Sequence, residues 1–400
     1  MVKLAEICEF VSGGTPSRNI AEYFTGDIPW ITGADINDDR VQSIRYYITE
    51  KAIQESATNI VSAGNILLVT RTGVGKVAIA GRDVCISQDF TGLIVDDKRV
   101  DKKYLYHYLR SQKDYFVSNQ RGATIKGVTR SVVENLEVPI PYPDDPACSL
   151  AEQRRIVARL ELLLGETRAM RDDIDAMRRD LAQVMESALA EVFPNPNGEM
   201  PKGWGWKSID DLFELQQGAS MSPRRRQGRN PQPFLRTKNI LWGEVDTSDV
   251  DVMDFTEDEI ERLKLRKGDL LICEGGDVGR AAVWEDQLPL VMYQNHIHRL
   301  RRKSDDADPK FYVYWMKAAY QLFKIYQGEE SRTAIPNLSG RRLKNFLVPT
   351  TSLTEQRRIV AYLEHIAEEI RAMDDLLAQD LRSLEALEQS ILAAAFRGEV

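Results

Sequence analysis

The sequence predicts an α+β protein in which one mixed α/β domain occurs twice, and each copy is followed by a long helix. Three observations predict this architecture: a repeated twelve-residue segment, short β-rich runs in both halves, and a heptad pattern after each half. SLAEQRRIVARL from Ser149 recurs as SLTEQRRIVAYL from Ser352, and ten of the twelve positions are identical. Such a long internal match indicates a duplication. We expect globular domains over residues 1–148 and 204–350, helices over 149–193 and 351–400, and a linker over 194–203.

Two further pairs of segments keep nearly the same separation along the chain. GNILLVTRTGVGKVAI from Gly64 matches GDLLICEGGDVGRAAV from Gly268, and IPWITGADI from Ile28 matches QPFLRTKNI from Gln232. The short apolar runs in these segments, separated by glycine and polar turns, are typical of strands. Because the strands do not alternate regularly with helices, we expect α+β domains and not a doubly wound parallel sheet.

Both long helices carry an apolar seam of coiled-coil spacing, in alternating steps of three and four residues. In the first helix the predicted seam comprises Ile156, Leu160, Leu163, Thr167, Met170, Ile174, Met177, Leu181, Val184 and Ala188. In the second helix the spacing begins at Ile359 and Leu363 and continues through Met373 and Leu377. An apolar seam needs a partner, and the duplicated helix has the matching period. A whole domain separates the helices, so the chain can return and pair them antiparallel; the alternative is that the seams only dimerise the protein.

Composition and charge limit the possible functions. The 400 residues include 53 basic and 61 acidic side chains, a net charge of −8, and four widely spaced cysteines, which we expect to be free thiols. The long helices contain 12 basic and 19 acidic residues, so they carry −7 of this charge. The globular domains are therefore nearly neutral and can present basic faces to a polyanion. The opening residues do not form a secretion signal, so we expect a cytoplasmic protein that does not enter a membrane.

Basic and polar side chains gather at predicted turns, where they could contact phosphates or base edges. Four arginines in PRRRQGR form the densest cluster, for which we favour contact with a polyanion. For the other cations the alternative is a merely solvated charge, and Asn295 and His296 could equally satisfy a turn or a strand edge. The candidate DNA-binding residues are Arg71, Thr72, Lys76, Arg121, Lys126, Arg130, Arg224, Arg225, Arg226, Arg229, Lys238, Arg280, Asn295, His296, Arg341, Arg342 and Lys344.

No catalytic or metal site is predicted. RTGVGK differs from a phosphate-binding loop because Lys76 is followed by Val77 and the glycine spacing is wrong. His296 and His298 could share a face of a strand, but a third metal ligand is missing. A nuclease or methylase acting alone and a stand-alone coiled-coil interaction protein are the competing hypotheses. An interaction protein would show no preference among random DNA sequences.

Several segments resemble the specificity subunits of type I restriction–modification systems. GGTPSRNIAEYFTGDIPWITGADI resembles the opening of their target-recognition domains, and MPKGWGWKSIDDLFEL resembles the start of the second such domain. LAEQRRIVARL and LTEQRRIVAYL are similar to the starts of the two conserved helices. The second copy departs from the family pattern, since it has QGASMSPRRR where the first has GGTPS.

The resemblance implies a non-catalytic DNA-recognition subunit. Each target-recognition domain would read one half of a bipartite double-stranded target, and the antiparallel helices would set the spacer. The helices would also recruit two modification subunits, which methylate adenine with S-adenosylmethionine; restriction and translocase subunits that need ATP and Mg²⁺ would join them. This chain itself would hold no cofactor. We assign the partner interface to the two repeated segments, through Gln153, Arg154, Arg155, Gln356, Arg357 and Arg358.

Overall fold

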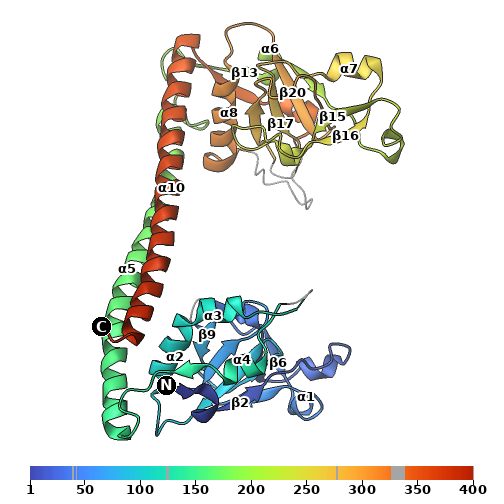
Figure 1. Cartoon of the computed structure of the whole chain (residues 1–400). Coiled ribbons are helices and arrows are strands. Elements are labelled where there is room, and N and C mark those ends of the chain that lie inside the picture. The colour runs from blue at the N-terminus through green and yellow to red at the C-terminus, as the bar shows by residue number, and fades with distance from the viewer. Residues whose placement is uncertain (38–39, 42, 123–125, 276–277, 326–337, 400) are drawn as a thin grey trace. The chain divides into compact units, whose positions relative to one another are not determined.

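The computed structural model describes residues 1–37, 40–41, 43–122, 126–275, 278–325 and 338–399 (Figure 1). Its contacts divide the chain into two compact units. The first unit combines Met1–Ile174 with Gln379–Val400, and the second is Asp175–Ala378. Each unit therefore holds one globular domain together with part of both long helices.

The first domain contains two four-stranded sheets. One sheet has the order β2 (Cys8–Ser12), β11 (Phe90–Val95), β8 (Ile66–Val69), β9 (Val77–Ile79), and all its pairs are antiparallel. The other has the order β6 (Tyr46–Ile48), β3 (Ile28–Ile31), β10 (Val84–Ile86), β7 (Asn59–Val61). Two small pairs join β1 (Val2–Lys3) to β12 (Glu137–Val138) and β4 (Ile36–Asn37) to β5 (Arg40–Val41). The helices are α1 (Glu50–Gln54), α2 (Lys102–Ser111), α3 (Lys113–Ser118) and α4 (Arg130–Glu134).

The second domain repeats this arrangement. Its antiparallel sheet has the order β14 (Phe213–Gln217), β20 (Ile297–Arg302), β17 (Leu270–Cys273), β18 (Ala281–Val283). A three-stranded sheet has the order β16 (Asp251–Asp254), β15 (Pro231–Leu235), β19 (Met292–Tyr293), and β13 (Gly205–Ser208) pairs with β21 (Leu347–Thr350). The helices are α6 (Ile209–Leu212), α7 (Glu257–Leu263), α8 (Pro309–Lys317) and α9 (Gly340–Lys344).

The duplication extends to strand direction. In the first domain β3 and β10 form a parallel pair, with Trp30 opposite Cys85. In the second domain β15 and β19 are likewise parallel, with Phe234 opposite Met292. A parallel pair inside a mostly antiparallel domain is a distinctive feature, and both copies have it at the corresponding place. The predicted α+β class and the duplicated architecture are confirmed.

The two long helices, α5 (Pro146–Val192) and α10 (Leu353–Phe396), pair antiparallel within each unit (Figure 1). In the second unit Arg178 pairs with Asp374, while Glu191, further along α5, accepts a hydrogen bond from Tyr362, earlier in α10. In the first unit Arg171 lies 3.4 Å from Glu388. The predicted antiparallel pairing of the helices is therefore present in both units.

The apolar seam differs from the predicted one in the middle of α5. Met170, Met177 and Val184 were expected in the seam, but they are 51%, 56% and 40% exposed. Thr167 and Ile174 are buried as predicted, whereas Leu164 and Met185 are buried one residue after the predicted Leu163 and Val184. The shift follows from the two arginines, Arg171 and Arg178, which turn toward α10 and pair with its acidic side chains. The second helix shows the same discrepancy at Met373, which is exposed.

The ends of both helices are part of the domain cores. Leu160 and Leu164 of α5 and Leu392 of α10 belong to the buried cluster of the first domain. Met185 and Leu189 of α5 join Ile359 and Leu363 of α10 in the corresponding cluster of the second domain. Each domain is thus packed on both helices, and its core would be opened by separating it from them.

The cysteines and the helices were also subjects of prediction. Cys8, Cys85, Cys148 and Cys273 are free, as predicted, although Cys148 is exposed. Within the described ranges, no helix combines the length and the apolar character needed to cross a lipid bilayer.

Two neighbouring leucines test the position of the seam. Leu160 is fully buried, whereas Leu162 is 56% exposed on the same helix. Leu160→Ala is expected to lower the free energy of unfolding by about 2–5 kcal/mol, because it leaves a cavity in the core. Leu162→Ala is expected to change it by less than about 0.5 kcal/mol. Urea denaturation of the two variants measures both values, and equal losses would contradict this seam.

Candidate nucleic-acid interface

Three loop segments meet at the same place in each domain, which we call the loop junction. In the first domain the junction joins residues 70–76, 87–89 and 126–128. Thr70 N donates to Asp89 O at 2.7 Å, and Val128 N donates to Thr70 O at 2.8 Å. The end of β8 is thus connected to both other segments through its backbone.

The second domain repeats the junction with residues 274–275, 278–280, 294–296 and 338. Glu274 N donates to His296 O at 2.8 Å, and Leu338 N donates to Glu274 O at 2.9 Å. Backbone bonds of this kind do not depend on side-chain identity, so the framework can be kept while its side chains change. Thr70 and Asp89 of the first copy stand where the second copy has Glu274 and His296.

The glycines of the junction explain its close packing. Gly75 has φ +88° and Gly279 has φ +81°, a backbone region that favours glycine. A Cβ on Gly127 would lie 3.0 Å from Thr70 O and 3.1 Å from Cγ of Arg71. The glycine therefore lets the 126–128 segment pack directly against the turn that carries Arg71.

The structure brings together the two basic clusters predicted in the first domain. Arg71 and Thr72 are exposed on the turn, and Thr72 Oγ1 donates to Asp89 at 3.4 Å. Arg121 forms a two-way backbone bridge with Gly127, so it belongs to the segment that packs on Arg71. Lys126 is also exposed on this segment. The junction thus presents Arg71, Arg121 and Lys126 on adjacent loops.

Arg130 lies at the first turn of α4, immediately after the same segment. Its guanidinium pairs with Glu134 at 2.7 Å and lies 5.5 Å from the ring centre of Phe10. Its side chain remains about half exposed. An arginine fixed in this way can still present donors to a phosphate.

Two predicted contact residues have an internal role. Lys76 is half-buried and its Nζ donates to Ile36 O at 3.0 Å. Arg280, at the corresponding position of the second copy, donates from Nη2 to Thr237 O at 2.6 Å. Both cations connect the glycine turn to the neighbouring 3₁₀ turn, Gly33–Asp35 or Thr237–Asn239. Each bond uses one of the side chain's several N–H donors, so the predicted contacts of Lys76 and Arg280 with DNA stay a prediction.

The arginine cluster PRRRQGR divides into two kinds of residue. Arg225 is half-buried, donates to both carboxylate oxygens of Glu259 and to Asp254 O, and lies over the ring of Phe255. The hydrogen bonds from Arg225 lower the pKa of Glu259 to about 2. Arg225 is therefore held within the fold, and its contact with DNA stays a prediction.

The flanking arginines of this cluster point outward. Arg224, Arg226 and Arg229 are exposed, and their side chains make no ion pair with any residue that the structure describes. The loop that carries them is held through its backbone, since Gln227 N and Asn230 N each donate to the Asp254 carboxylate at 2.9 Å. A fixed loop with three outward guanidinium groups is suited to binding an anionic backbone.

The remaining candidates of the second domain have mixed environments. Lys238 is exposed but pairs with Asp249 at 2.6 Å, and Lys344 pairs with Asp210 at 3.3 Å. Arg341 and Arg342 are exposed on α9, next to the junction residue Leu338. Charged groups that already have partners on the surface contribute less to attracting a polyanion than unpaired ones.

The predicted Asn295 and His296 lie in the junction itself. Asn295 is half-buried, and its backbone groups bond to Ala219 O and to the Gln217 side chain. His296 is exposed, with Nδ1 3.7 Å from Glu274. His298 is fully buried, its Nε2 lies 3.1 Å from Leu338 O, and burial lowers the pKa of its imidazole. Among the described residues, no group of three or more His, Cys, Asp or Glu side chains could hold a metal ion.

Sequence reasoning missed an arginine–tyrosine cluster in the first domain. Arg45 bonds to Asp35 and to Thr32 Oγ1, and the guanidinium groups of Arg45 and Arg18 each lie 5.8 Å from the ring centre of Tyr46. Tyr46 is partly exposed. The signal was present in the sequence as SIRYY, a cation followed by two aromatic residues, but it lies outside the glycine turns where contacts were sought.

The repeated EQRR segments are also only partly exposed. Arg154, Arg155, Arg357 and Arg358 are on the surface, and Arg155 and Arg358 each pair with a glutamate three residues earlier. Gln153 and Gln356 are 0% and 1% exposed. Their assignment to a partner interface is corrected, because these glutamines bond to the backbone of their own domains.

Comparisons with known proteins agree with the duplicated fold. The family described as type I restriction modification DNA specificity domain matches residues 1–174 and again 201–379. The MjaIX specificity subunit of Methanocaldococcus jannaschii is 29% identical over 265 residues, which cover 60% of this chain and 58% of that protein. The EcoKI specificity subunit of Escherichia coli K12 is 24% identical over 424 residues, which cover 99% and 88%.

A solved structure supports the fold over the whole chain. It was determined in work on complex assembly and conformational transition of the type I R-M system, and it is 23% identical. The alignment covers 100% of this chain and 97% of that chain, with a TM-score of 0.74. The resemblance identified from the sequence motifs is confirmed.

The pairing of Arg225 with Glu259 predicts a pH dependence of stability. The pKa of Glu259 in the folded protein lies below its unfolded value, so the pair stabilises the fold above about pH 4.5 and this stabilisation is lost as the pH falls toward 2. We expect Glu259→Gln to reduce the free energy of unfolding by a constant amount between pH 6 and 8, and by less as the pH falls. Denaturant titrations across the pH range measure the difference, and a difference that grows in acid would contradict the assignment.

Proposed function

The chain belongs to the type I restriction–modification DNA specificity family, and from this membership we propose that its two domains each read one half of a bipartite double-stranded DNA target. The observation that carries the proposal is the repeated loop junction. Each domain has its own copy, with the same backbone bonds and with different side chains. Two similar frameworks with different side chains are suited to reading two different half-sites.

The differences between the copies support unlike half-sites. At equivalent positions the first copy has the half-buried Asp89 and the second has the exposed His296, while Thr70 and Glu274 are buried beneath them. Carboxylates accept hydrogen bonds from the exocyclic amino groups of cytosine and adenine, whereas arginines are matched to guanine. The exposed arginines also lie on different segments, with Arg71 in the first glycine turn and Arg224 and Arg226 in a loop of the second domain.

The chain contributes recognition, and the chemistry belongs to its partners. In this proposal two modification subunits supply adenine methylation with S-adenosylmethionine, and restriction and translocase subunits supply ATP- and Mg²⁺-dependent cleavage. Assembly with DNA would take place in the cytoplasm. Purified chain mixed with DNA and S-adenosylmethionine is accordingly expected to transfer no methyl groups.

The long helices are the proposed docking surface for the modification subunits. In the second unit Met177 and Val184, which were expected in the seam, are exposed on α5, and Met373 and Leu376 are exposed on α10. Exposed apolar side chains at heptad spacing on a helix fit a helix of a second protein. The acidic character of the helices keeps this surface away from DNA.

The exposed arginines predict a measurable salt dependence. Arg224→Ala combined with Arg226→Ala is expected to weaken binding to specific and nonspecific DNA alike and to reduce the slope of log K against log salt by about 2, because roughly one phosphate contact is lost per arginine. Fluorescence anisotropy at several salt concentrations measures the slope.

The matched control removes two arginines from the surface of α10. Arg371 and Arg382 are exposed there, so Arg371→Ala with Arg382→Ala changes the net charge equally. We expect this control to leave the slope unchanged. Equal effects of the two double variants would show that only overall charge matters and would remove the PRRRQGR loop from the interface.

A further inference from the structure

A buried glutamine connects each domain to the long helix that follows it. In the first unit Asp101 precedes α2 and caps it by accepting from the N–H groups of Lys103 and Tyr104. The Gln153 side chain of α5 reaches this cap: its Oε1 accepts from Asp101 N at 2.8 Å, and its Nε2 donates to Arg99 O at 3.2 Å. One amide thus satisfies a donor and an acceptor at the start of α2.

The second unit contains the same joint. Asp308 caps α8 by accepting from Lys310 N at 3.0 Å. Gln356 of α10 accepts from Asp308 N at 2.9 Å and donates to Asp306 O at 3.0 Å. Both copies have kept the same two-way bond although the loops within the domains differ in length.

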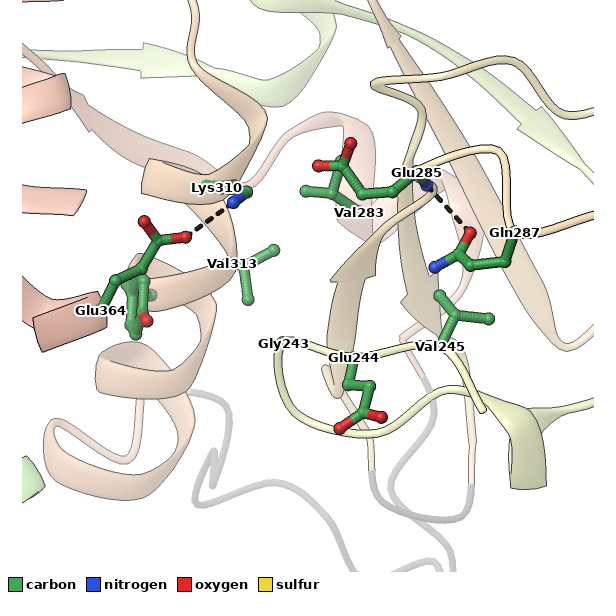
Figure 2. A pocket seen from close by; sticks show the side chains of 10 residues that line it. Gly243, Glu244, Val245, Val283, Glu285, Gln287, Lys310, Val313 and Glu364 are labelled. Carbon is green, nitrogen blue, oxygen red and sulfur yellow. Dashed lines mark hydrogen bonds and ion pairs between the residues drawn. The ribbon is translucent and has the colours of Figure 1, made fainter. Parts of the chain in front are cut away.

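A lysine–glutamate pair forms a second connection beside each glutamine. Lys103 Nζ lies 2.8 Å from Glu161 of α5, and Lys310 Nζ lies 2.6 Å from Glu364 of α10. Figure 2 shows the second pair bridging α8 and α10 in the wall of a pocket of about 160 Å³. These pairs are partly exposed, so they add little stability, but they hold the same two helices together.

Aromatic side chains form a third connection, to the other long helix. Phe396 at the end of α10 packs edge-on against Tyr104 and Tyr108 of α2, with both ring centres 5.1 Å away. Phe193, just past the end of α5, packs against Phe311 and Trp315 of α8 at 5.2 and 5.5 Å. Helices α2 and α8 are therefore each attached to both long helices.

We propose that Gln153 and Gln356 are positioning residues that fix the direction in which each domain presents its loop junction, and so determine the spacer length that the protein accepts. The inference rests on the proposed function, because a spacer exists only for a bipartite target. Hydrogen bonds are directional, and the amide holds the cap in one orientation, which an apolar contact would not specify. A purely stabilising contact could be apolar, since an apolar pair of the same shape can replace a buried hydrogen bond at little cost.

The test compares Gln153→Met and Gln356→Met with Arg159→Met. Methionine keeps the volume of glutamine and removes its hydrogen bonds, while Arg159 is an exposed residue of α5 outside the joint. The full chain, assembled with its modification subunits, first selects binders from a pool of random duplex DNA. The two half-sites that it selects are then presented with spacers that vary by single base pairs.

The expected result is a change in spacer preference alone. The two glutamine variants should select the same half-site sequences, while their preference for the best spacer over its one-base-pair neighbours falls roughly tenfold, as expected when buried hydrogen bonds that hold the geometry are lost. Arg159→Met should keep the spacer profile of the unchanged protein. A sharp, unshifted profile in both glutamine variants would overturn the inference and leave the proposed function intact.

A different outcome would contradict the proposed function. If the unchanged protein selects one continuous motif or none, the bipartite reading is wrong, and the positioning role is wrong with it. Should a methionine variant fail to fold, Glu161→Gln and Glu364→Gln weaken the same joints at partly exposed pairs. These variants are also expected to reduce the preference for the best spacer over its neighbours. Spacer profiles identical to that of the unchanged protein would contradict the positioning role of the joint.

Discussion

The structure depends on burial of an apolar seam that neither long helix can cover alone. Each helix packs at its start against the domain that precedes it in the chain, and at its end against the other domain. Leu392 of α10 lies in the core of the first domain, and Leu189 of α5 lies in the core of the second. Each domain therefore shares one hydrophobic core with parts of both long helices.

Charged residues inside the seam determine how the helices pair. Arg171 and Arg178 occupy positions that an apolar residue would fill in a regular coiled coil, and acidic side chains of α10 meet both. Partly buried ion pairs contribute little net stability, but they penalise registers in which an arginine would face an apolar side chain. The antiparallel direction and the register are thus specified together. Because Arg171 and Arg178 turn inward, the neighbouring Met170 and Met177 lie on the outer face, where they are available to a partner.

Much of the architecture could be predicted from the sequence because duplication is visible in it. The repeated EQRR segment, the matched glycine turns and the heptads predicted the two domains and the two helices. The position of the seam could not be predicted in full, because Met170 and Arg171 are neighbours and only packing decides which of them turns inward. The candidate DNA-binding residues were predicted at turns and most of them are exposed there, yet Lys76, Arg225 and Arg280 bond within the fold. A sequence shows that a residue is cationic, but it does not show which acceptor its side chain bonds to. That acceptor can lie far along the chain, as Glu259 does for Arg225.

The most direct test of the account lengthens both helices together. Seven residues of heptad pattern inserted after Ile174 and seven after Ala378 keep the seam continuous and add about 10 Å to the helix pair. The account predicts that the protein selects the same two half-sites with a spacer about three base pairs longer, measured by selection from random duplex DNA. Altered half-sites, or an unchanged spacer in a folded variant, would contradict it.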